Sequence, residues 1–121
     1  MDQKRRVVVT GLGLISPLGN SVKTSWNSAI EGRSGAALIS KFDTENFLTK
    51  FGATVKDFEA LDCIDPKEAR RTDLFIQYGT AAAIEAINDS GFLEFYQLED
   101  IGVSVSSGIG GLSTIEENAI I

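Results

Sequence analysis

The chain of 121 residues contains no histidine and one cysteine, Cys63. Without histidine, the chain alone cannot form a Ser-His-Asp triad, a Cys-His dyad or a histidine-ligated metal site. A single cysteine can form neither an intrachain disulfide nor a thiolate zinc site. Because Asp62 and Asp65 flank Cys63 and disfavour its thiolate, we interpret it as a structural thiol.

Long apolar segments are also absent. The three valines at 7–9, behind a charged start, are too few for a signal-peptide core, and no stretch approaches a membrane span. The chain has 17 Asp and Glu against 11 Lys and Arg, a formal net charge of -6, which argues against a nucleic-acid-binding face. We therefore expect one globular, cytoplasmic domain with neither a nucleic-acid nor a membrane partner.

Apolar spacing and capping residues predict an α/β chain. Strands are predicted over 6–10, buried on both faces, and over 101–105, where apolar and small residues alternate, with a short strand over 51–55 and mostly loop over 33–50. Helices are predicted from Asn20 or Ser21 to Gly32, from Asp65, over 73–89, and from a capping box at Ser113. The helix over 73–89 has little polar surface and is expected to be largely buried.

A glycine motif follows the first predicted strand. Residues 7–13, Val-Val-Val-Thr-Gly-Leu-Gly, are similar to a dinucleotide site, in which glycines let a pyrophosphate approach a helix N-terminus. The match is poor, because Gly19 comes too late, Pro17 interrupts the turn and no second strand ends in a suitably placed acid. A plain tight turn is the simpler interpretation, and a Rossmann-type oxidoreductase fragment stays an alternative.

Two further features leave alternatives open. Lys67, Arg70 and Arg71 have i, i+3, i+4 spacing and share one face of the predicted helix. Such a cluster is usually solvated surface, here partly paired with Glu68 or Asp73, and the alternative is a docking site. The small-residue run over 104–111 fits either a wall that a ligand approaches or a close contact between two elements.

Three longer stretches form a specific combination of motifs. They are RRVVVTGLG with SPLG in 5–19, KEARRTDLFIQYG in 67–79, and SGIGGL with EEN in 107–118. Phe42-Asp43 and Lys50-Phe51 also fit. Over essentially the whole chain, this combination resembles the N-terminal part of the beta-ketoacyl-acyl carrier protein synthases, the condensing enzymes of fatty acid biosynthesis.

The resemblance implies a thiolase-like fold with layered αβαβα architecture, usually in a homodimer. Residues 1–121 would form the N-terminal part of the first thiolase-like half, and the uncapped apolar end at 119–121 agrees with a longer chain. The family's nucleophilic cysteine, two histidines and lysine would follow Ile121, so no catalytic residue is assigned here. The implied reaction is a decarboxylative Claisen condensation between acyl- and malonyl-carrier protein, with no metal or other cofactor.

The resemblance also implies two local roles. Lys67, Arg70 and Arg71 match the family's basic patch, which docks the acidic acyl carrier protein. Ile109 matches the side chain that lines and gates the acyl-chain pocket, and Gly108 and Gly110 would give that gate its backbone freedom. A non-catalytic carrier-binding module is the remaining alternative.

Overall fold

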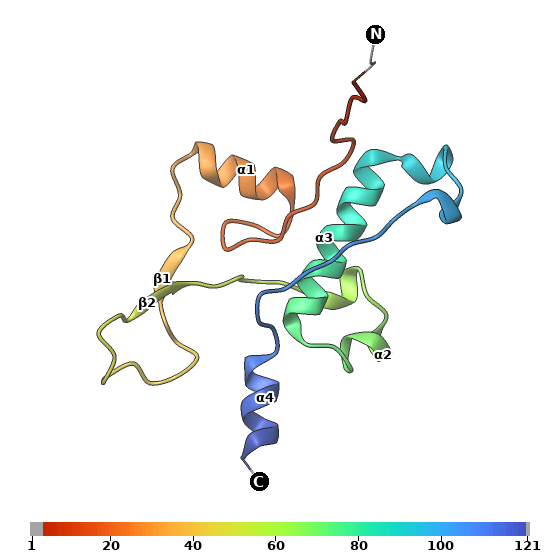
Figure 1. Ribbon diagram of the computed structural model, residues 1–121. Helices are drawn as coiled ribbons and strands as arrows, with labels where there is room; N and C mark the ends of the chain where they lie inside the picture. Colours follow the sequence, from red (N-terminus) through yellow and green to blue (C-terminus); the bar gives the residue numbers. More distant parts are fainter. Residues whose placement is uncertain (1–3, 121) are drawn as a thin grey trace.

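Helix α3 (Leu74–Ser90) forms the centre of the computed structural model, which describes residues 4–120 (Figure 1). The other helices are α1 (Val22–Ile30), α2 (Pro66–Ala69) and α4 (Leu112–Ala119), and a hairpin joins β1 (Ala36–Leu38) to β2 (Phe51–Ala53). The short 3-10 helices are η1 (Ala60–Asp62), η2 (Phe92–Glu94) and η3 (Leu98–Asp100). The hairpin and α4 extend away from α3 (Figure 1). The segments before α1, around α2 and after α3 contact α3 directly.

The helix starts follow the capping residues. The Ser21 hydroxyl accepts the Thr24 N–H, and the Thr24 hydroxyl accepts the Ser21 N–H, which completes a capping box for α1. Helix α1 is followed by Gly32 at φ 69°, in the left-handed region that favours glycine. Asp65 caps the start of helix α2, and its carboxylate accepts the Lys67 N–H at 2.8 Å. Both predictions are confirmed, although α2 has only four residues.

Helix α3 has the predicted extent but not the predicted burial. It ends at Gly91, which has φ 61°. Within this helix Gln77 alone is buried, whereas Leu74, Phe75 and Ile76 are exposed. The expectation of a largely buried helix is therefore wrong for residues 4–120, because segments 11–13 and 105–110, together with η1 and η2, cover α3 only in part. The remaining apolar surface of α3 faces solvent.

Two of the predicted strands do not form. Residues 6–10 and 101–105 make no β-pairing, and the three valines at 7–9 are exposed. A strand requires a second backbone to complete its hydrogen-bond ladder, and no described segment provides one for either stretch. The sheet present among residues 4–120 is the antiparallel β1–β2 pair, registered Ala36 to Ala53, Ala37 to Gly52 and Leu38 to Phe51. It confirms the short strand within 51–55, adds a strand where loop was expected, and gives no layered arrangement.

The start of α4 differs from its predicted capping box. The cap residue is Gly111, at φ 64°, and it provides no side-chain cap. The Thr114 hydroxyl donates instead to the Asp73 carboxylate, at the start of α3. Because Gly111 also lies against Asp73, the start of α4 is fixed to the start of α3 by tertiary contacts and not by local capping.

Candidate functional site

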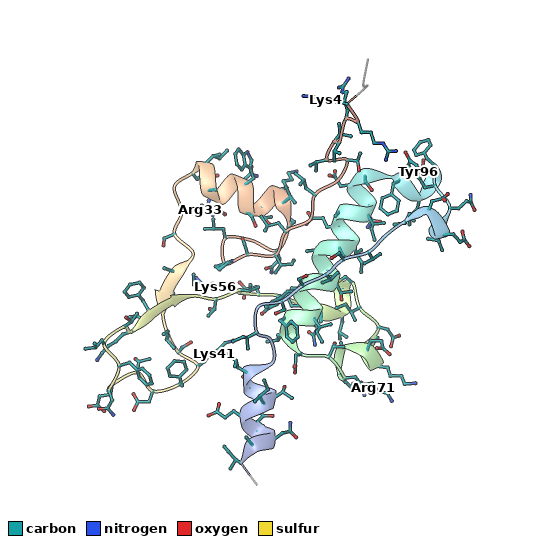
Figure 2. The ribbon with its side chains drawn as sticks, in the orientation of Figure 1. Lys4, Arg33, Lys41, Lys56, Arg71 and Tyr96 are labelled. Carbon is teal, nitrogen blue, oxygen red and sulfur yellow. The ribbon has the colours of Figure 1, made fainter. Side chains whose placement is uncertain are left out.

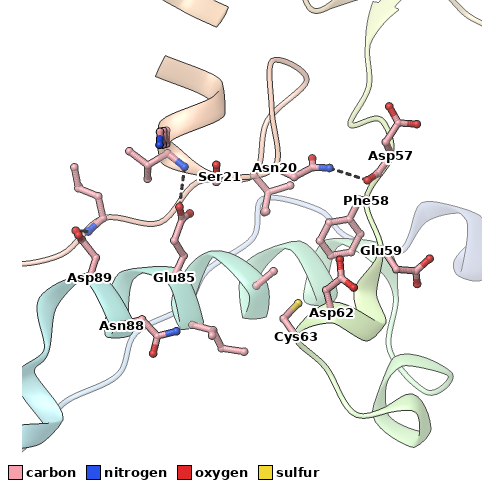
Figure 3. A pocket seen from close by; sticks show the side chains of 16 residues that line it. Asn20, Ser21, Asp57, Phe58, Glu59, Asp62, Cys63, Glu85, Asn88 and Asp89 are labelled. Carbon is pink, nitrogen blue, oxygen red and sulfur yellow. Dashed lines mark hydrogen bonds between the residues drawn. The ribbon is translucent and has the colours of Figure 1, made fainter. Parts of the chain in front are cut away.

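A cavity of about 660 Å³ lies where α1, α3 and the segment before α2 meet (Figure 3). Its wall is mainly acidic and apolar, and includes Leu12, Asn20, Val22, Asp57, Phe58, Glu59, Asp62, Cys63, Glu85 and Asp89. The Asn20 amide donates to the carbonyls of Lys56 and Asp57, at 2.9 and 3.0 Å. This links the loop before α1 to the segment before α2.

Two acids of α3 bind backbone groups along this cavity. The Asp89 carboxylate accepts the Leu12 N–H, and the two Glu85 oxygens accept the N–H groups of Leu14 and Val22, each at 2.9 Å. We call Glu85 and Asp89 the carboxylate clasp. Val22 begins α1, so the clasp also satisfies one of the unpaired donors of that helix end. The sequence signal, overlooked in the prediction, was two acids four residues apart on an otherwise uncharged helix.

The glycine motif allows close contact between the segment at 11–14 and α3. A Cβ at Gly11 or Gly13 would collide with the backbone of α3 at Ala86 or Ala82, so both glycines allow the segment to lie directly on the helix. The start of α1 is already occupied by Glu85 and the Ser21 capping box. A pyrophosphate would meet a carboxylate there, so the dinucleotide-binding alternative loses its structural basis.

Replacing Glu85 with glutamine tests the clasp. Glu85→Gln keeps the shape of the side chain but turns an amide N–H toward a backbone N–H. We expect amide exchange over 12–22 to accelerate about tenfold, as lost charge-assisted hydrogen bonds permit local opening. Hydrogen–deuterium exchange with mass spectrometry measures this. Glu94→Gln, at an exposed glutamate, is the control, and equal exchange in both variants would contradict a clasp.

Cys63 lies on the wall of the same cavity and fits the predicted structural role. Its Sγ donates to the Ala60 carbonyl at 3.5 Å. Burial, and then the neighbouring Asp62 charge, raise the pKa of the thiol. A raised pKa keeps the thiol protonated at neutral pH, and the protonated form is a poor nucleophile.

The three predicted docking residues form an exposed basic patch, which we define as Lys67, Arg70 and Arg71. They border a surface depression of about 580 Å³ on α2 and the turn after it. Arg71 extends away from the ribbon (Figure 2). Within residues 4–120 the salt bridge formed is Arg33–Glu31, so the expected pairing of the basic patch with Glu68 or Asp73 does not occur. These cations are available to an anionic partner.

The residues predicted to line the acyl pocket lie on a loop against the start of α3. Ile109 is 75% exposed. A Cβ at Gly110 would lie 2.5 Å from the Phe75 ring, which explains the glycine there, whereas Gly108 has open space and no positive φ. A nearby apolar groove of about 480 Å³ includes Phe75 and Val105 but not Ile109. The structure therefore gives a reason for glycine at 110 and none at 108.

Residues 4–120 contain neither a metal-ligand cluster nor a membrane-crossing helix. No three side chains of the histidine, cysteine, aspartate and glutamate types converge to hold a metal ion. No helix in this part of the chain has the length and apolar character needed to cross a membrane.

Comparisons with known proteins agree with the sequence motifs. Residues 4–119 match the family model described as "Beta-ketoacyl synthase, N-terminal domain". The chain is 52% identical over 115 residues to the "3-oxoacyl-[acyl-carrier-protein] synthase 2" of Vibrio harveyi, covering 93% of this chain and 28% of that protein. It is 42% identical over 120 residues to the protein of that name from Synechocystis, covering 98% and 29%. The chain thus spans less than a third of the length of these relatives.

A solved structure extends the comparison to three dimensions. The ishigamide ketosynthase/chain length factor is 38% identical, with a TM-score of 0.65, and the match covers 81% of this chain and 23% of that one. The shared fold agrees with the expected thiolase-like fold. Because residues 4–119 match the model of its N-terminal domain, this chain belongs to the beta-ketoacyl synthase family.

Proposed function

We propose that the chain is the N-terminal part of a 3-oxoacyl-acyl carrier protein synthase, which elongates acyl groups by decarboxylative Claisen condensation. In this reaction an acyl group moves from its carrier to a cysteine, malonyl-carrier loses carbon dioxide, and the resulting carbanion attacks the acyl thioester. The match over residues 4–119 carries this proposal. The nucleophile and the imidazoles that stabilise developing negative charge belong to the remainder of the synthase.

In this proposal the described residues bind and orient substrate. The basic patch attracts the acidic carrier, and charge complementarity of this kind mainly speeds encounter and sets orientation. The loop of Ile109 forms part of the acyl-pocket wall. The basic patch and the loop of Ile109 both lie near the N-terminal end of α3. The turn after α2 leads into Asp73, and the loop packs on Phe75. A carrier docked on the patch would therefore lie near the loop.

We propose further that the full-length protein has the layered αβαβα architecture and works as a cytoplasmic homodimer. The exposed apolar surface of α3 and the exposed valines at 7–9 support additional layers that cover them. Pairing of segments 6–10 and 101–105 with further strands would supply the missing ladders.

An assay of the full-length protein tests the proposal. With acyl- and malonyl-carrier protein, we expect carbon dioxide release and a 3-oxoacyl-carrier product, detected by mass spectrometry. A protein that binds the carrier without condensation would instead support a non-catalytic carrier-binding module. A protein that neither binds the carrier nor condenses would refute both functions.

A further inference from the structure

Gln77 is one of two buried polar residues in the described chain, with 8% of its surface exposed. Its side-chain Nε2 donates to the carbonyls of Ala69 and Thr72, each at 2.8 Å. Both hydrogens of the amide are thereby used. A buried amide in an otherwise apolar helix face is costly unless it is paired, so these two bonds explain how the chain accommodates Gln77.

The two carbonyls flank the arginines of the basic patch. Ala69 ends α2 and precedes Arg70, and Thr72 follows Arg71. Gln77 therefore fixes the backbone on both sides of the two arginines. The Thr72 hydroxyl adds a bond to the Glu68 carbonyl, at 2.9 Å, within the same turn.

Helix α2 depends on such tertiary bonds. It has four residues, and a helix of one turn is not stable by itself. Gln77 belongs to the seventeen-residue α3, which also positions the loop of Ile109 through Phe75 and Gly110. Gln77 thus connects the backbone of the basic patch to α3, against which the loop of Ile109 packs.

We propose that Gln77 is a positioning residue for carrier docking. Without touching the carrier, it sets the direction in which Arg70 and Arg71 extend from the turn between α2 and α3. The inference rests on the proposed function, because it assumes that the basic patch docks acyl carrier protein. The buried position of Gln77 excludes it from direct contact, so any effect on the carrier must pass through the turn it holds.

The test uses Gln77→Met in the full-length synthase, which retains side-chain volume and removes both donors. We expect the KM for acyl-carrier protein to rise about fivefold, with kcat at saturating carrier changed less than about twofold, on the scale of two lost hydrogen bonds. Gln97→Met, the same replacement at an exposed residue, is the matched control and should leave both constants unchanged.

A second background separates the inference from the proposed function. In a variant with Lys67, Arg70 and Arg71 all replaced by alanine, Gln77→Met should raise the KM no further, because coupled residues are non-additive. If the alanine variant itself binds the carrier normally, patch docking is wrong. If the alanine variant raises the KM but Gln77→Met in the original protein does not, the positioning role is wrong. A lowered kcat, or an equal KM increase in both backgrounds, would indicate a purely structural role and overturn the inference.

A milder variant keeps the inference testable if Gln77→Met does not fold. Gln77→Asn keeps an amide but shortens the side chain by one methylene, so it can reach at most one of the Ala69 and Thr72 carbonyls. We expect the KM for the carrier to rise about twofold, since one hydrogen bond of the same turn is lost. An unchanged KM in a folded Gln77→Asn protein would overturn the positioning role of Gln77.

Discussion

Charge reversal of the basic patch, by Lys67→Glu with Arg71→Glu in the full-length synthase, is expected to weaken carrier binding about 100-fold at low salt. Both side chains are exposed and form no salt bridge within residues 4–120, so the substitutions remove no internal pairing. They replace attraction to an acidic carrier with repulsion. Fluorescence anisotropy measures the dissociation constants of the variant and the original protein. The ratio of the two should fall as salt rises, because ions screen exposed charges.

A second pair of lysines provides the matched control. Lys41→Glu with Lys50→Glu changes the net charge equally, but these residues lie in the segment that joins β1 to β2. If the net charge governed binding, both double variants would weaken it alike. We expect less than about a threefold effect from the control, as remote exposed charges interact weakly. Unchanged affinity of the patch variant at low salt would contradict docking at the patch.

Ile109→Phe is expected to shorten the acyl chain that the full-length synthase accepts. For long acyl-carrier substrates we expect kcat/KM to fall about tenfold or more, on the scale of the cost of overfilling a packed pocket. Short substrates should be used at near-normal rates. The exposed position of Ile109 means that the larger side chain does not disturb packing among the described residues. Rates across a series of acyl lengths measure the change.

Ile109→Val serves as the control for this substitution. It keeps an aliphatic side chain and adds no volume, so the chain-length profile should be retained. A Phe variant with the profile of the original protein would show that Ile109 does not line the acyl pocket. A uniform loss at every acyl length would indicate a disturbed loop, and would equally contradict a gate at this position.

Local chemistry made the helices predictable. Ser21 with Thr24, and Asp65 with the proline after it, satisfy the first donors of α1 and α2 using side chains within a few residues. Gly91 ends α3 because its left-handed conformation excludes most side chains. The basic patch was predictable as a cluster, but not as one helical face, because α2 ends at Ala69 and both arginines lie in the turn after it. These signals are local, although α3 also supports both helices, through Glu85 for α1 and Gln77 for α2.

Features that depend on distant partners were not predictable. The 7–9 and 101–105 segments have the residue types of strands, but strand formation depends on a neighbouring backbone. The predicted cap of α4 failed because Asp73, far away in sequence, binds Thr114. The positioning bonds of Gln77 and the carboxylate clasp also join side chains to backbone groups of other elements. The sequence can mark such side chains, as the two acids of α3 show, but it does not identify the distant backbone groups that they bind.

The carboxylate clasp has a consequence for insertions and deletions. Leu12 and Leu14 are two residues apart, about 6.6 Å in an extended chain, and their acceptors lie four residues apart on α3, a rise of about 6 Å. The spacing of the two acids on the helix thus matches a spacing of two residues in the segment, and the two chain directions are opposite. A single-residue insertion at position 13 would turn alternate N–H groups and side chains to the wrong side. Natural length variation should therefore fall outside residues 11–14, while the loop between β1 and β2 is free to change.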